Sequence, residues 1–203
     1  MKGKYTLGDY VFQFITIAAG VLLALFASGL NEFYNNRQLV AQARTNIARE
    51  LADNKKDLEA TMAGFPRDRE SLRNAIKFAD EMLSAQKTAI TSLQLHYNMA
   101  DLLATAWHTA ERTGALSHME YAEVQRYSKL YDFQDLFVEQ QRLILSQLSS
   151  ASAILQGDFN PDKPNPRDLE LFRERVMQLM ASLTIQEDFA KRLAENYAEA
   201  LKQ

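Results

Sequence analysis

Cysteine is absent from this chain of 203 residues, and glycine and proline are scarce, with seven and four residues. Without cysteine there are no disulfide bonds, no thiolate nucleophile and no cysteine-ligated metal centre. The sequence also lacks a glycine-rich phosphate loop, a nucleophile elbow and a paired-carboxylate arrangement. No stretch alternates β-branched and polar residues as an amphipathic strand does. These absences favour an all-α protein that is not an enzyme, and we expect no catalytic residues, no metal ligands and no cofactors.

Charged side chains are missing from residues 10–31, which lie between Asp9 and Glu32. At about 1.5 Å rise per residue, a helix of this length spans roughly 33 Å, enough to cross a hydrocarbon core of about 30 Å. We therefore predict a membrane anchor at residues 1–30, with transmembrane residues at about 10–31. The remainder, residues 31–203, is predicted to be a helical extramembrane domain.

A cleaved signal peptide is the alternative for this apolar run. Lys2 and Lys4 give the chain a basic start, and Ala27-Ser28-Gly29 resembles a weak cleavage site. The run is longer than the usual apolar region of about 7–15 residues, and Asp9 separates it from the lysines. An uncleaved single-pass anchor is therefore the favoured interpretation.

The charges that flank the run predict its orientation. Lys2, Lys4 and the terminal amine precede it, whereas Arg37 and Arg44 follow it. The positive-inside rule then places the N-terminus in the cytoplasm and, in a bacterial inner membrane, the domain in the periplasm. Apart from Lys2, Lys4 and Asp9, the chain has 21 basic and 25 acidic side chains. This negative balance argues against nucleic acid as a partner.

Apolar periodicity predicts that the transmembrane helix continues directly into a long helix over residues 31–63. Gly64 is expected to end this helix. Pro66 is expected to start a second helix, because proline is favoured in a first helical turn, and this helix fades near Lys87.

The remaining periodic segments predict three more helices. The first covers residues 98–113, with Gly114 as a left-handed C-cap. Ser117 and Glu120 have the spacing of a capping box that opens the next, which runs to about Gln156. A loop at residues 157–165 precedes a last helix that begins at Pro166. The predicted architecture is all-α, an antiparallel bundle of about five helices built on the helix that leaves the membrane.

Two blocks of sequence resemble a family of uncharacterised bacterial membrane-anchored proteins. Gly20-Val-Leu-Leu-Ala-Leu and Asn31-Glu32 are similar to that family's G-E/D…G-x-L-x-A-L…W-N-E helix, with Gly8-Asp9 as the opening pair and Leu30 in place of the tryptophan. The block from Ala106 to Leu116 is similar to its short helix and small-Gly-x-Leu turn. The resemblance covers about a third of the chain and implies a one-span anchor with a helical domain. Because the family's function is unknown, the resemblance transfers no functional residues.

Small side chains recur every four residues inside the apolar run, at Thr16, Gly20, Ala24 and Ser28. In lipid, small residues let two helix backbones approach closely, because apolar side chains gain little by leaving the surrounding hydrocarbon. We expect this face, called the small-residue face below, to contact another transmembrane protein or a second copy of this chain. The simpler interpretation is that such residues are common in transmembrane segments.

Four aromatic residues, Trp107, Tyr121, Tyr127 and Tyr131, form a candidate ligand pocket in the domain. Aromatic side chains at helical spacing more often belong to a hydrophobic core. His108 and Glu111 lie three residues apart, but two ligands do not make a metal site, and we expect them on the surface.

The sequence favours a non-enzymatic, single-pass membrane protein with a helical interaction domain. Its expected role is an accessory or assembly subunit of a membrane complex, or a self-associating scaffold. The alternative is a membrane-tethered ligand-sensing domain that signals through a partner. A membrane-tethered hydrolase has no residue that supports it.

Overall fold

The computed structural model describes residues 7–84, 93–156, 160 and 163–202. Within these ranges the chain forms four α-helices and one short 3₁₀ helix, with no strand. The predicted all-α class is confirmed, but two of the five predicted helices are parts of one. The predicted helix end near Lys87 and most of the predicted loop at 157–165 lie outside the described residues. The elements are α1 (Leu7–Leu83), α2 (Thr105–Arg112), the 3₁₀ helix η1 (Ala115–His118), α3 (Tyr121–Gln156) and α4 (Pro166–Ala200).

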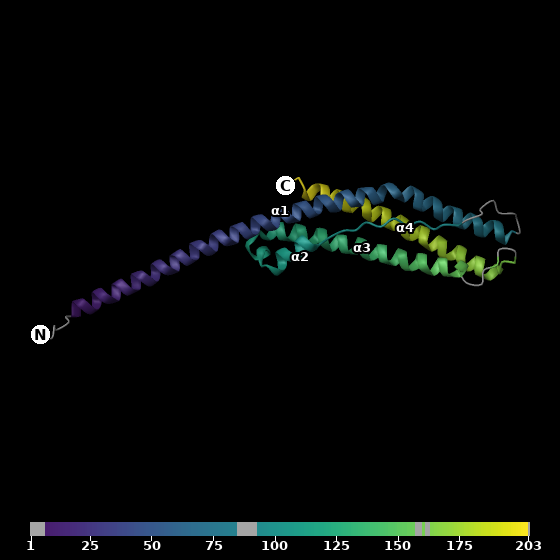
Figure 1. Cartoon of the computed structure of the whole chain (residues 1–203). Coiled ribbons are helices and arrows are strands. Elements are labelled where there is room, and N and C mark those ends of the chain that lie inside the picture. The colour runs from purple at the N-terminus through teal and green to yellow at the C-terminus, as the bar shows by residue number, and fades with distance from the viewer. Residues whose placement is uncertain (1–6, 85–92, 157–159, 161–162, 203) are drawn as a thin grey trace.

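Helix α1 has 77 residues and is roughly 115 Å long. Its N-terminal part extends alone, and its C-terminal part lies in the bundle with α3 and α4 (Figure 1). Val40, Ala43 and Ile47 are the first buried side chains along α1, spaced three and four residues apart. The bundle therefore begins near Val40, and the predicted continuation of the apolar run into a long helix is confirmed.

The predicted break at Gly64 and Pro66 is wrong, because α1 continues through both residues. A proline inside a helix removes a backbone hydrogen bond and costs about 3 kcal/mol. Burial of Phe65 and Leu72 in the core offsets this cost. Gly64 lies against the Asn98 side chain instead. A Cβ at this position would lie 2.9 Å from the Cγ of Asn98, so a larger residue would require that side chain to move.

Helices α3 and α4 are antiparallel neighbours, and α4 also packs along α1. An extended segment, residues 93–104, runs between α1 and α3 (Figure 1). We call this segment the strap. The core of the bundle is therefore enclosed by three helices and one extended segment, with Leu51, Phe137 and Leu183 among its fully buried side chains.

The strap corrects the predicted helix at residues 98–113, which is helical only from Thr105 to Arg112. Backbone groups of the strap bond to side chains of α1 and α3 instead of to one another. Gln141 of α3 accepts from the Ala100 N–H at 2.8 Å and donates to the Ala100 carbonyl at 3.0 Å. Asn54 of α1 pairs with Leu103 in the same way, at 2.9 and 2.7 Å. Each amide side chain thus supplies the donor and the acceptor that a neighbouring strand would provide.

Other polar side chains of α1 accept hydrogen bonds from the strap and from the start of α2. Asp68, which is fully buried, accepts from both the backbone N–H and the side-chain amide of Asn98, at 3.0 and 2.9 Å. These contacts explain why polar residues occupy buried positions on α1, since buried backbone groups must find partners. Further acceptors are Ser71 for the His96 N–H, Asp57 for the Asp101 N–H and Glu50 for the Ala106 N–H.

The turn between α2 and α3 confirms one sequence prediction and corrects another. Gly114 follows α2 with φ +77°, the left-handed conformation that favours glycine at the end of a helix. The predicted capping box is wrong, because Ser117 lies within η1 and its hydroxyl donates to the Gly114 carbonyl. Glu120 precedes α3, where its own carbonyl accepts from the N–H groups of Glu123 and Val124.

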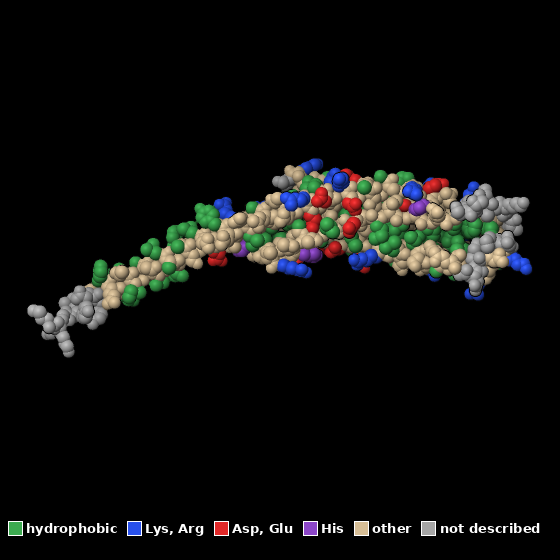
Figure 2. All heavy atoms as spheres, in the orientation of Figure 1, with side chains coloured by type: hydrophobic (Ala, Val, Ile, Leu, Met, Phe, Trp, Pro, Cys, Tyr) green, Lys and Arg blue, Asp and Glu red, His purple; other side chains and the backbone are tan. Residues whose placement is uncertain are grey.

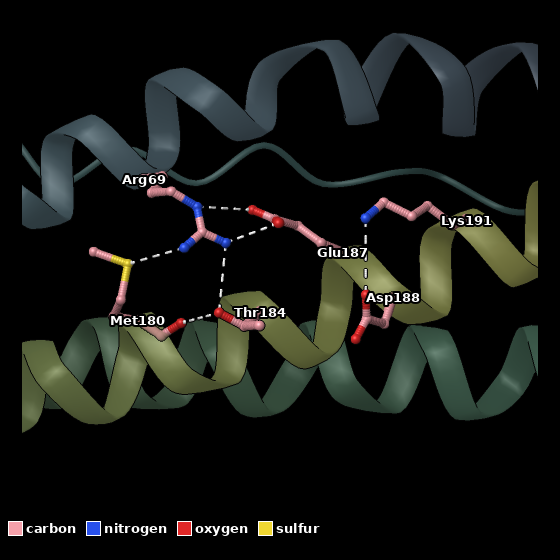
Figure 3. Close-up of polar contacts among 6 residues, drawn as sticks. All are labelled: Arg69, Met180, Thr184, Glu187, Asp188 and Lys191. Carbon is pink, nitrogen blue, oxygen red and sulfur yellow. Dashed lines mark hydrogen bonds and ion pairs between the residues drawn. The ribbon is translucent and has the colours of Figure 1, made fainter.

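Helix α4 begins at Pro166, as predicted, and Asn165 caps it by accepting from the Arg167 N–H at 3.1 Å. An ion pair then joins α4 to α1. The Arg69 guanidinium of α1 donates to both carboxylate oxygens of Glu187, at 2.8 and 3.3 Å (Figure 3). This bidentate geometry fixes the relative position of the two helices along their axes.

Candidate functional site

The N-terminal part of α1 presents an apolar surface that the rest of the described chain does not cover. α1 is long and apolar enough to cross a membrane, and none of its most apolar stretch is buried. Figure 2 shows hydrophobic side chains along this part, whereas acidic and basic side chains gather on the bundle. A continuous apolar surface of this size in water is typical of a site for membrane or protein contact.

The small-residue face lies on this exposed surface. Thr16, Gly20, Ala24 and Ser28 are all exposed, and a Cβ at Gly20 would meet no other atom within 4 Å. The Thr16 hydroxyl donates to the Phe12 carbonyl of the same helix at 2.9 Å. This face can therefore pack against another helix without leaving the Thr16 hydroxyl unpaired.

Two exposed aromatic residues, Phe33 and Tyr34, follow the apolar run and were not singled out by the sequence analysis. Their rings form an edge-to-face pair with centroids 6.2 Å apart. The Arg37 guanidinium lies over the Phe33 ring, 5.2 Å from its centroid. Aromatic and basic residues at the end of an apolar helix are typical of the interface between a membrane and water. Their position just after the apolar run was the sequence signal for this feature.

Three of the four predicted aromatic residues come together where α2 meets α3. Trp107 stacks on Tyr131, with centroids 5.4 Å apart and planes at 16°, and its centroid lies 6.3 Å from that of Tyr127. Tyr121 lies apart from this cluster and is 77% exposed. The stacked rings of Trp107 and Tyr131 fill the space between them, so this contact belongs to the packing of α2 on α3.

Glu50 joins the aromatic cluster to α1 and was missed by the sequence analysis. Its carboxylate is buried, accepting from the Tyr131 hydroxyl at 2.8 Å and from the Ala106 N–H at 2.7 Å. Burial and this hydrogen bond raise the pKa of the Tyr131 hydroxyl above its ordinary value. Glu50 therefore acts as a hydrogen-bond acceptor that positions α2 and Tyr131. The sequence around Glu50 contains no motif that indicates this role.

His108 and Glu111 lie on the outer surface of α2. The His108 Nδ1 and Glu111 Oε2 are 3.6 Å apart, and both side chains are more than half exposed. Among the described residues, no group of three or more histidine, aspartate and glutamate side chains is placed to hold a metal ion. The pair is therefore an ordinary surface contact between neighbouring turns of a helix.

A cavity of about 610 Å³ opens between α1, the start of α3 and the end of α4. We call it the junction cavity. Tyr127 lines it, whereas Trp107, Tyr121 and Tyr131 do not. On its wall, Arg44 donates to both oxygens of Glu123, at 2.8 and 2.6 Å. The lining residues are Arg44, Ala48, Glu123, Arg126, Tyr127, Lys129, Leu130, Asn196, Glu199, Ala200 and Leu201.

Comparison of the chain with protein-family models, curated proteins and solved structures finds no match in any of the three. Three structural features therefore bear on function: the exposed apolar part of α1, the bundle attached to it and the junction cavity.

Proposed function

We propose that this protein is a non-enzymatic, single-pass membrane protein whose helical domain makes protein–protein contacts. The observation that carries the proposal is the division of α1 into two parts. Its exposed apolar part would span the bilayer, and its other part belongs to the core of the bundle. An unbroken helix between them would hold the domain at a fixed distance and rotation relative to a partner in the membrane.

The proposed partner is another transmembrane protein or a second copy of this chain, bound through the small-residue face. In the first case the protein is an accessory or assembly subunit of a membrane complex, and in the second it is a self-associating scaffold. The exposure of Gly20 and Ala24 supports both. The resemblance to one-span anchored bacterial proteins agrees with this proposal and adds no partner.

Extraction of the tagged full chain in a mild detergent, followed by native mass spectrometry, tests the proposal. We expect a stoichiometric membrane partner or a homo-oligomer. The variant G20L/A24L should lose the association, because larger side chains keep the helix backbones apart. The matched control A18L/G29L makes the same types of change on the opposite face of the helix and should keep it. A monomer without a partner, or equal association in both variants, would contradict the proposal.

We also propose that the protein resides in a bacterial inner membrane with its N-terminus in the cytoplasm and its domain in the periplasm. The excess of positive charge before the apolar run supports this orientation. Alkaline phosphatase fused after Gln203 should be active, because this enzyme acquires its disulfides only outside the cytoplasm. An inactive fusion that is present in the membrane at the normal amount would reverse the orientation.

A second candidate function is a ligand-sensing domain that signals through a membrane partner. The junction cavity favours it, because its volume of about 610 Å³ lies within the range of small-molecule sites, about 300–1,000 Å³. The cavity is lined by α1, so a bound ligand would contact the helix that leads to the membrane.

A further inference from the structure

The junction cavity combines cationic and apolar lining. Arg126 and Lys129 of α3 make no ion pair or hydrogen bond within the described part of the chain, unlike Arg44, which is paired with Glu123. Both are exposed, three residues apart, and therefore on neighbouring turns of the same side of α3. Besides Glu123, which pairs with Arg44, the lining has one acidic side chain, Glu199 of α4.

The side chains that line the cavity carry an excess of one positive charge, and Glu120, outside the lining, also acts electrostatically on Arg44. Arg44, Arg126 and Lys129 contribute three, and Glu123 and Glu199 remove two. The whole chain carries a net charge of −3, so this excess runs against the overall balance. An anion that carries one charge would balance the charges of these lining side chains.

The apolar part of the lining favours a ligand that has an apolar body in addition to its charge. Ala48, Tyr127 and Leu130 supply aliphatic and aromatic surface from α1 and α3. Burial of such surface contributes about 25 cal/mol per Å², so an apolar body adds affinity that a simple inorganic anion lacks. The Arg44–Glu123 ion pair fixes the wall between α1 and α3, and the cavity is therefore formed without a ligand.

We propose that the junction cavity binds a small organic carboxylate with an aromatic or aliphatic body. The carboxylate lies near Arg126 and Lys129, and the body packs on Ala48, Tyr127 and Leu130. Arg44 lies 13 residues beyond Asn31, which corresponds to roughly 20 Å along a helix. This distance from the end of the apolar run favours a soluble ligand over a lipid headgroup. The proposal rests on the sensing function, the second candidate above.

Isothermal titration with 2-naphthoate as the probe tests the proposal, with the full chain in phosphatidylcholine nanodiscs and empty nanodiscs as the blank. We expect saturable binding to one site per chain at concentrations up to about 5 mM. The neutral isostere 2-naphthamide should bind at least tenfold more weakly, because it lacks the charge that the two cations recognise. No saturable binding of 2-naphthoate, or equal binding of the amide, would overturn the proposal.

Paired variants locate the site. R126A/K129A should weaken 2-naphthoate binding at least tenfold. K56A/R142A removes two exposed cations that lie outside the cavity and should bind as the unmodified chain does. A48W fills the cavity and keeps every charge, so it should also abolish binding. Equal affinity in R126A/K129A and K56A/R142A, or undiminished affinity in A48W, would overturn the site. Failure here removes the sensing function and leaves the interaction proposal, which is measured by co-purification, unchanged.

Discussion

Gln141 and Gln186 lie on neighbouring helices and are both fully buried, but their side chains are satisfied very differently. Gln141 forms two hydrogen bonds with Ala100 of the strap. Neither polar atom of the Gln186 side chain has a hydrogen-bond partner among the residues that the structure describes. A buried polar group without a partner costs about 1–3 kcal/mol, whereas a paired one contributes about 1 kcal/mol per bond. The same residue type therefore stabilises one position and destabilises the other.

Replacement by methionine, which has a similar shape, should separate the two positions. Gln186→Met should raise the free energy of unfolding by about 1–2 kcal/mol, because it removes an unpaired amide. Gln141→Met should lower it by about 2 kcal/mol, because the N–H and carbonyl of Ala100 lose their partners. Urea unfolding followed by circular dichroism measures both changes. Equal effects of the same sign in the two variants would contradict this interpretation.

At the scale of elements, the strap is the part that the sequence did not predict. Its hydrogen-bond partners are distant in the chain. Asn98 and Asp68 are 30 residues apart, and Leu103 and Asn54 are 49 residues apart. Local composition and periodicity contain no information on such contacts, and residues 98–104 of the strap were predicted to be helical. Long helices such as α4 were predictable, because their signals are local. These signals are apolar residues at helical spacing and a residue that favours the first turn, here Pro166.

Asn54 should protect the Leu103 amide of the strap from hydrogen exchange. Asn54→Leu removes the acceptor for the Leu103 N–H but leaves the two bonds between Gln141 and Ala100 in place. Hydrogen exchange at the Leu103 amide should become at least tenfold faster, which corresponds to about 1.4 kcal/mol of lost protection. Exchange at Ala100 serves as the internal control and should change little. Equal acceleration at both amides would show that the whole strap is released together.

At the scale of the whole molecule, the candidate site was only partly predictable. The exposed small-residue face follows from a local apolar pattern. Of the four aromatic residues predicted to form a pocket, the structure brings Trp107, Tyr127 and Tyr131 together and leaves Tyr121 apart. The junction cavity combines α1, α3 and α4, and its position depends on where the end of α4 meets the start of α3. Helical periodicity predicts which face of each helix is buried, but it does not predict this alignment of helix ends.

Buried tyrosines couple the stability of the whole bundle to alkaline pH. Burial raises the pKa of Tyr97, Tyr131 and Tyr197 well above the ordinary value of 10.0. Below pH 10 these tyrosines keep their protons in both the folded and the unfolded state, so their contribution to the free energy of unfolding does not vary with pH. Above pH 10 the unfolded state loses protons that the folded state retains. The free energy of unfolding should therefore fall by about 1.4 kcal/mol per pH unit for each tyrosine as pH rises through this range.

Tyr97 gives the sharpest test of this dependence, because its buried hydroxyl has no hydrogen-bond partner in the described part of the chain. Tyr97→Phe removes one titrating group without breaking a bond, so stability at pH 7 should be unchanged or slightly higher. The slope of stability against pH above pH 10 should become shallower by about 1.4 kcal/mol per unit. Tyr121→Phe is the matched control, since it makes the same change at a side chain that is 77% exposed. Urea unfolding at a series of pH values measures the slopes, and identical slopes in the two variants would rule out Tyr97 as a source of the alkaline instability.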